Sequence, residues 1–109
     1  MEIELKEIRS KGVKLFVSQD GQEVARAYLY IMNNDLHQEP FGLMEDIFVN
    51  DALRGKGIGT KLVEALIDKA RGEGCYKLVA YSRYSNGQVH KLYQRLGFID
   101  HGKEFRINF

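Results

Sequence analysis

The chain has 109 residues, of which 44% are hydrophobic and 28% are charged, a composition that predicts a globular protein with one domain over residues 1–109. Sixteen basic and fifteen acidic residues leave a formal net charge of only +1, which argues against nucleic acid as a partner. No apolar run approaches the roughly 20 residues of a membrane span, and the start of the chain is unlike a signal peptide. The single cysteine excludes an intrachain disulfide. We therefore expect a cytoplasmic protein with no membrane partner.

The first half of the chain is dominated by short segments in which apolar residues alternate with polar ones, a pattern that predicts strands. Asp20 and Gly21 predict a tight hairpin turn between two of these strands. A polar, turn-rich stretch at 33–40 predicts a loop. The strands expected in this half are 2–9, 12–18, 23–32 and 41–49.

The apolar pattern then changes to a helical period. Apolar residues recur every four positions from Ile58 to Ala70, which predicts an amphipathic helix of about four turns ending near Gly72. A second helix is expected between Asn86, a residue type common at N-caps, and Gly97. Further strands are expected at 76–82, 98–99 and 105–109.

The expected element order is therefore β-β-β-β-α-β-α-β-β. A helix that connects two strands of one sheet makes those strands parallel, whereas the strands of the preceding meander are antiparallel. The sequence thus predicts an α+β fold with a mixed, mainly antiparallel sheet.

The run Arg-Gly-Lys-Gly-Ile-Gly-Thr at residues 54–60 joins an expected strand to the first expected helix. Glycines allow backbone N–H groups to approach a ligand closely, and the start of the helix adds unpaired N–H donors and the positive end of its dipole. This combination predicts a site for phosphate or pyrophosphate, to which Arg54 and Lys56 add positive charge.

Three glycine-loop motifs compete for this run. A P-loop, G-x-x-x-x-G-K-[ST], is excluded because Lys56 is followed by glycine and no suitable glycine lies upstream. The dinucleotide fingerprint G-x-G-x-x-G fails because residue 60 is threonine and the preceding meander is not a βαβ unit. The pattern [RQ]-x-x-G-x-[GA] is matched in full by Arg54, Gly57 and Gly59.

That last pattern belongs to the GNAT N-acetyltransferase superfamily, which the chain resembles in two blocks. Residues 47–59 resemble the family's strand-loop-helix block, and residues 86–98 resemble its second block, Asn…Tyr…Gly-Phe. The order of the two blocks and their separation also fit the family. The resemblance is good over residues 22–109 and loose over residues 1–21. It implies a GNAT-like acyl-CoA N-acyltransferase fold, in which a bulge makes the strand at 41–49 splay from a neighbouring central strand.

The resemblance also implies that acetyl-CoA is the cosubstrate. In the family the loop amides hold the pyrophosphate, the end of the preceding strand pairs its backbone with pantetheine, and an asparagine lies near pantetheine. That asparagine matches Asn86, whose alternative role is to cap the helix. The residues expected to bind acetyl-CoA are Ile47, Phe48, Val49, Arg54, Gly55, Lys56, Gly57, Ile58, Gly59, Thr60 and Asn86.

The reaction implied is transfer of the acetyl group to a primary amine by direct attack. Tyr93 matches the family tyrosine that protonates the departing thiolate; alternatively it is only an aromatic residue on the apolar helix face. Glu45 is slightly favoured over Asp46 as the general base, and a water relay or plain solvated carboxylates are the alternatives. His90 is a weaker alternative base. The histidines have no ligand-like spacing, so we expect no metal site.

One departure from the family pattern concerns the acceptor. Family members usually have one or two helices after their first strand, whereas residues 9–12 connect directly to the next expected strand. We therefore expect an open acceptor side, which suits a protein lysine or N-terminus, or a side completed by a homodimer, which suits a small amine. The alternative function is a catalytically silent CoA-binding or protein-interaction module.

Overall fold

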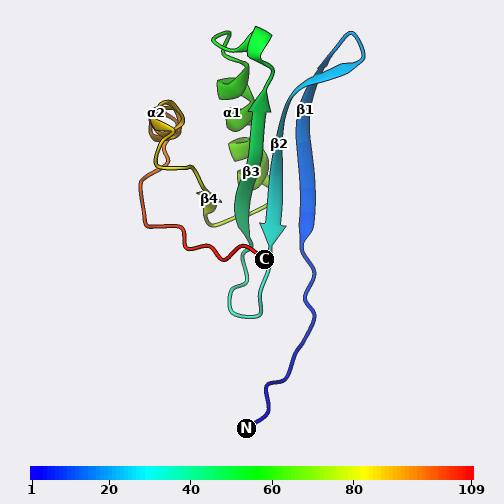
Figure 1. Ribbon diagram of the computed structural model, residues 1–109. Coiled ribbons are helices and arrows are strands. Elements are labelled where there is room, and N and C mark those ends of the chain that lie inside the picture. Colours follow the sequence, from blue (N-terminus) through cyan, green and yellow to red (C-terminus); the bar gives the residue numbers. More distant parts are fainter.

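The computed structural model describes all 109 residues and contains a four-stranded sheet of order β1-β2-β3-β4 (Figure 1). The first three strands are antiparallel neighbours, and β3 and β4 are parallel. The sheet is therefore mixed and mainly antiparallel, as predicted. The elements are β1 (Lys11–Gln19), β2 (Gln22–Met32), β3 (Phe41–Val49), the short 3-10 helix η1 (Asp51–Leu53), α1 (Ile58–Gly72), β4 (Leu78–Ala80) and α2 (Gly87–Arg95).

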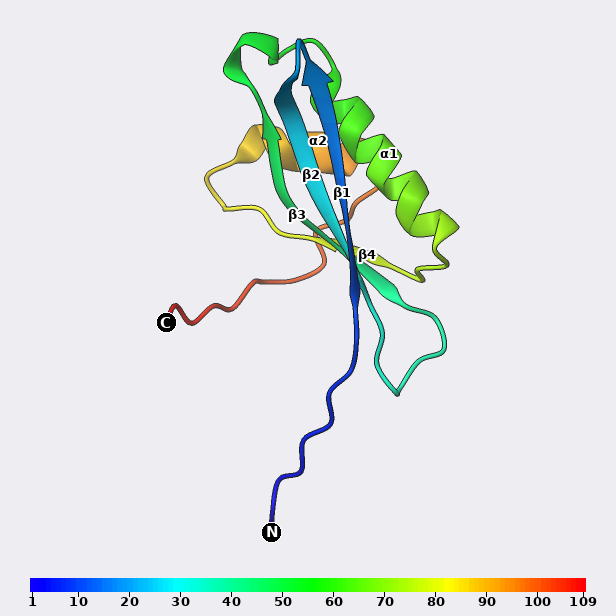
Figure 2. The same cartoon turned by 90° about the vertical axis from the view of Figure 1, so that its right-hand side faces the viewer.

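Helix α1 covers one face of the sheet, and the hydrophobic core lies between them (Figure 2). Alternate residues of β2 face the helix because successive side chains of a strand point to opposite faces. Leu29 from β2 and Val63 and Leu66 from α1 are the largest fully buried side chains. Gly42 in β3 allows close packing, since a Cβ there would lie 2.9 Å from the Leu78 side chain. The buried cluster comprises Ala25, Ala27, Leu29, Ile31, Met44, Leu62, Val63, Leu66 and Ala70.

Three of the expected strands do not form. Residues 2–9, 98–99 and 105–109 make no ladder with another strand, although their apolar residues alternate. Alternation shows only that a segment suits a half-buried strand, and a strand also needs a partner for its backbone groups. The strand expected at 76–82 is reduced to β4. The β3–β4 pair consequently lies at the edge of the sheet and not at its centre.

The α+β class and both expected helices are nevertheless confirmed, and the element order becomes β-β-β-α-β-α. The hairpin turn is also confirmed, with Asp20 and Gly21 both at positive φ. Neither helix has the length and apolar character that crossing a membrane would require.

Candidate functional site

Strand β3 separates from β4 halfway along its length. The parallel ladder joins only Gly42–Met44 to Leu78–Ala80. Immediately afterwards the register between β2 and β3 shifts, and Asp46 adopts a φ of 51°, in the left-handed region that aspartate tolerates better than most residues. This is the β-bulge that the family resemblance implied. Beyond it, β3 has no strand on its β4 side.

The backbone of residues 47–49 therefore has one open side. The N–H of Asn50 donates to the carbonyl of Val24 in β2 at 2.8 Å. Since alternate residues of an antiparallel strand direct their polar groups to opposite sides, Phe48 faces β2 while Ile47 and Val49 face the open side. The Ile47 and Val49 side chains pack against the core, so packing and backbone binding are compatible at these two residues.

The loop before α1 presents a run of unpaired donors. None of the six backbone N–H groups from Gly55 to Thr60 has a hydrogen-bond acceptor in the protein. Gly55 and Gly57 both have a φ of 80°, and a Cβ at either residue would project into open space. Gly57 is also the N-cap of α1, with no side chain to cap the helix. The loop thus offers six donors at the positive end of a helix dipole, a favourable setting for an anion.

The two cationic side chains of the loop differ from each other. Arg54 turns back toward β3: its Nε donates to the carbonyl of Val49 at 3.2 Å, and its Nη1 forms an ion pair with Asp51 at 2.9 Å. The expected positive charge at the mouth of the loop therefore does not come from Arg54 in this structure. Lys56 is exposed and has no acidic partner. Of the two, only Lys56 is free to meet an anion.

Close packing brings the loop and the open side of β3 together. A Cβ on Gly59 would lie 3.6 Å from the Cγ2 of Val49, so the first turn of α1 rests on the end of β3. The two segments expected to bind pyrophosphate and pantetheine are therefore contiguous in space.

Helix α2 carries the other two expected residues. The ring of Tyr93 packs against Phe98, with 5.2 Å between ring centroids, and against the core. Burial raises the pKa of the Tyr93 phenol above its ordinary value. Asn86 occupies the N-cap position, but its side chain does not cap the helix. Its amide is consequently available for another partner.

The carboxylates expected as the base lie at the bulge. Glu45 is half-buried and pairs across the ladder with Tyr28, whereas Asp46 is exposed. The pKa of Arg106 is raised, first by its hydrogen bond to Glu104 and to a smaller extent by Glu45, so the C-terminal segment passes near Glu45. His90 is half-buried on α2. The structure contains no group of three or more His, Cys, Asp or Glu residues placed to hold a metal ion.

Two features of the site were absent from the expectations drawn from individual residues. The bulge leaves no mark in the sequence apart from an aspartate that tolerates positive φ. The inward turn of Arg54 depends on where the end of β3 lies, which is a tertiary relationship. A third feature, a cavity of about 620 Å³, lies at the other edge of the sheet, between β1 and α1, and Ile58 is the only expected site residue that lines it.

This strand-loop-helix arrangement, with an open strand edge beside a cradle of amides, is the one that the GNAT resemblance implied. The model of the acetyltransferase (GNAT) family matches residues 2–98, and the chain belongs to this family.

The chain is similar to several curated proteins of this kind. It is 32% identical over 68 residues to glucosamine 6-phosphate N-acetyltransferase 1 of Oryza sativa subsp. japonica, covering 62% of this chain and 39% of that protein. It is 42% identical over 52 residues to an L-methionine sulfoximine/L-methionine sulfone acetyltransferase of Pseudomonas aeruginosa, covering 48% and 30%. The matched regions thus span less than half the length of these relatives.

Solved structures have the same fold. A Trypanosoma brucei acetyltransferase superposes with a TM-score of 0.81 at 28% identity, covering 90% of this chain and 69% of that one. The glucosamine-6-phosphate N-acetyltransferase of Arabidopsis thaliana gives a TM-score of 0.80 at 26% identity, covering 90% and 67%. The fold class inferred from the sequence is therefore confirmed.

Proposed function

We propose that residues 1–109 form a single acetyl-CoA-dependent N-acetyltransferase domain that acetylates a primary amine. The observation that supports this most strongly is the run of six unpaired N–H groups from Gly55 to Thr60 beside the open side of β3. Membership of the acetyltransferase family supports the same donor.

The loop binds the pyrophosphate of acetyl-CoA. A hydrogen bond to a charged acceptor contributes about 1.5–3 kcal/mol, so a few such bonds account for tight binding without an excess of basic surface. Lys56 adds a cation at the mouth of the loop. The backbone polar groups of Ile47 and the N–H of Val49 bind pantetheine in the manner of an added strand, whereas the Val49 carbonyl is held by Arg54. The Asn86 side chain, which makes no capping hydrogen bond, contacts the same arm.

The reaction is a direct displacement at the thioester. The amine nitrogen attacks the acetyl carbonyl carbon, a C–N bond forms, the C–S bond breaks, and the sulfur leaves with the electron pair. The departing thiolate takes a proton from the Tyr93 phenol, and the amine gives up a proton to Glu45, directly or through water. No covalent enzyme intermediate is needed, and Cys75 takes no part.

The environment of Tyr93 suits a general acid. Burial raises the pKa of its phenol, which keeps the proton on the oxygen at neutral pH until a thiolate forms beside it. Glu45 suits the base because it is half-buried beside the bulge, where β3 leaves β4. Asp46 is exposed at the same bulge and is the second choice.

The acceptor is a primary amine, either on a protein or on a small molecule. Relatives named for glucosamine 6-phosphate and for aminoglycosides make amino sugars the first small amines to test. A homodimer that walls the acceptor side would favour such a small amine.

The test is release of free thiol from acetyl-CoA in the presence of individual amines. The panel contains glucosamine 6-phosphate, an aminoglycoside, a lysine peptide and a peptide with a free N-terminus. We expect acceptor-dependent release with at least one of them. Tight binding of acetyl-CoA without turnover on any acceptor would contradict the proposal and favour a silent CoA-binding module.

A further inference from the structure

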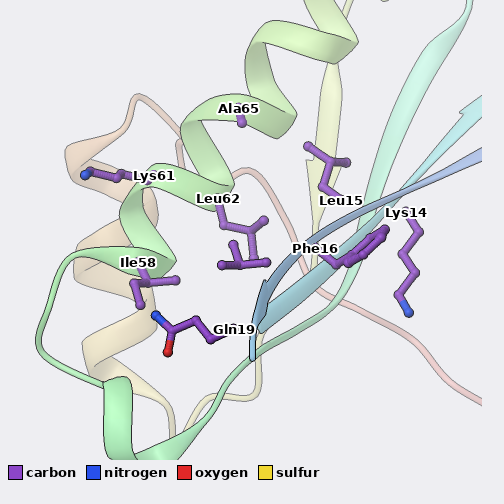
Figure 3. A pocket seen from close by; sticks show the side chains of 9 residues that line it. Lys14, Leu15, Phe16, Gln19, Ile58, Lys61, Leu62 and Ala65 are labelled. Carbon is purple, nitrogen blue, oxygen red and sulfur yellow. The ribbon is translucent and has the colours of Figure 1, made fainter. Parts of the chain in front are cut away.

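Strand β1 forms one edge of the sheet and has no neighbour on its outer side. Between this edge and the first half of α1 lies a groove of about 620 Å³ (Figure 3). Its floor is apolar, and Lys14 and Lys61 stand at its sides. A free strand edge next to an apolar groove can accept another strand, whose alternate side chains enter the groove. The apolar lining comprises Leu15, Phe16, Val17, Ile58, Leu62 and Ala65.

One segment of the chain has the properties of the missing strand. Residues 2–8 have no secondary structure, and Ile3 and Leu5 are 81% and 94% exposed. These two residues lie two positions apart, so they project from the same side of an extended strand. Three glutamates and one lysine give the segment a net charge of −2, which complements Lys61. Lys14, the other lysine of the groove, already forms an ion pair with Glu23 of its own chain.

The segment does not reach the groove of its own chain. Residues 1–10 continue beyond β1 in roughly the same direction, away from α1 (Figures 1 and 2). Lys6 forms an ion pair of 2.8 Å with Asp35 in the β2–β3 loop, at the opposite end of β1 from the groove. Folding back would require a reversal at residues 9–10, Arg and Ser, which do not favour the positive φ of a tight hairpin. Gly12 would suit such a turn, but it is already part of the β1–β2 ladder, where it pairs with Tyr30.

We propose that residues 2–8 of one copy pair with the β1 edge of a second copy, and that the second copy does the same in return. Residues 2–10 continue roughly in line with β1 (Figures 1 and 2). Two copies placed antiparallel about a two-fold axis near residues 10–11 therefore bring each segment beside the other copy's groove. Such an interface is self-complementary and closes as a dimer.

The face of the sheet on which each side chain lies depends on whether its residue number is odd or even. In the register that pairs odd-numbered residues with each other, Ile3 and Leu5 lie on the same side as Leu15 and Val17 and enter the groove. Ile8 then points to the opposite face of the sheet. A slip of one residue would turn Ile3 and Leu5 away from α1, so the apolar groove selects the register.

The first test is the mass in solution, measured by size exclusion with light scattering over a range of concentrations. We expect the intact chain to form a dimer of twice 12.5 kDa. The variant Ile3→Asp/Leu5→Asp should be a monomer, and the matched control Ile8→Asp should remain a dimer. All three residues are exposed, so circular dichroism should show an unchanged fold.

The second test distinguishes exchange from folding back within one chain. In a mixture of isotope-labelled and unlabelled copies, we expect intermolecular NOEs between the methyl groups of Leu5 and those of Leu15 or Val17. A monomeric intact chain, a dimer that survives Ile3→Asp/Leu5→Asp, a control that dissociates equally, or the same NOEs within one copy would each overturn the proposal.

Discussion

The Nε of Arg54 donates a hydrogen bond to the carbonyl of Val49 at 3.2 Å and so ties the start of the glycine loop to the end of the strand before it. The same guanidinium pairs with Asp51. Arg54 therefore acts on the candidate site through the position of the loop. An arginine in this motif is easily interpreted as a direct ligand of phosphate, and its geometry here indicates a positioning role.

This role makes a prediction about Arg54. Arg54→Ala should weaken acetyl-CoA binding about fivefold, the equivalent of one lost hydrogen bond of about 1 kcal/mol. Asp51→Asn removes only the exposed ion pair and should change affinity little. Calorimetric titration of both variants is the measurement. A loss of a hundredfold or more in Arg54→Ala would indicate direct contact with the phosphates instead.

A second prediction concerns the proton donor. Tyr93→Phe should lower kcat by about a hundredfold or more, because general acid catalysis typically contributes that much, with little change in acetyl-CoA affinity. Tyr84→Phe, at an exposed tyrosine, is the matched control and should leave kcat unchanged. Steady-state kinetics with the best acceptor would decide. Equal rates in the two variants would reduce Tyr93 to a packing residue.

The raised pKa of Tyr93 also predicts how stability depends on pH. Below a pH of about 10, the ordinary pKa of tyrosine, the phenol is protonated in both the folded and unfolded chains and contributes no pH dependence. Above it, the unfolded chain loses this proton before the folded chain does, so the free energy of unfolding falls as pH rises through the folded pKa. Denaturant titrations above pH 10 should show a shallower fall in Tyr93→Phe than in the unchanged chain; identical slopes would contradict the raised pKa.

The two carboxylates at the bulge make a fourth prediction. Glu45→Gln should lower turnover by about a hundredfold if Glu45 is the general base. Asp46→Gly removes the other carboxylate while suiting the positive φ of that residue, so it should preserve both turnover and stability. Turnover against pH for both variants is the measurement, and the reverse ranking would assign the base to Asp46.

The core makes a prediction about stability. Leu66 is fully buried between α1 and the sheet, so Leu66→Ala should lower the free energy of unfolding by about 2–5 kcal/mol. Leu36 lies exposed in the β2–β3 loop, and Leu36→Ala should change the free energy of unfolding by less than about 0.5 kcal/mol. Urea unfolding of both variants would show whether the core is placed correctly.

How far the sequence predicts this molecule differs from element to element. The four-residue spacing from Ile58 to Ala70 correctly predicts α1, and the glycines at positive φ correctly locate the loop, because both depend on local rules. Residues 2–9 have a strand pattern but no partner in the chain, and pairing is a long-range property that alternation does not specify. The bulge at Asp46 and the inward turn of Arg54 likewise depend on neighbours distant in sequence.

The candidate site also combines features that local sequence predicts with features that depend on the rest of the fold. Motif spacing distinguished the loop from a P-loop and from a dinucleotide fingerprint, and the structure adds that its six N–H groups are unpaired. Side-chain roles are harder to infer from sequence. Asn86 occupies the N-cap position but leaves its side chain free, a result that residue type alone cannot give.

The most direct test of the proposed donor site is calorimetric titration of acetyl-CoA into Gly57→Val and Gly74→Val. Both glycines have a φ near 80° and open space at the Cβ position, at opposite ends of α1, so the two variants carry the same backbone strain. If the amides of residues 55–60 bind the pyrophosphate, Gly57→Val should weaken binding by about a hundredfold or more, the loss of at least two hydrogen bonds to a charged acceptor. Gly74→Val should bind as the unchanged chain does. Equal affinity in the two variants would contradict the assignment of the loop as the acetyl-CoA site.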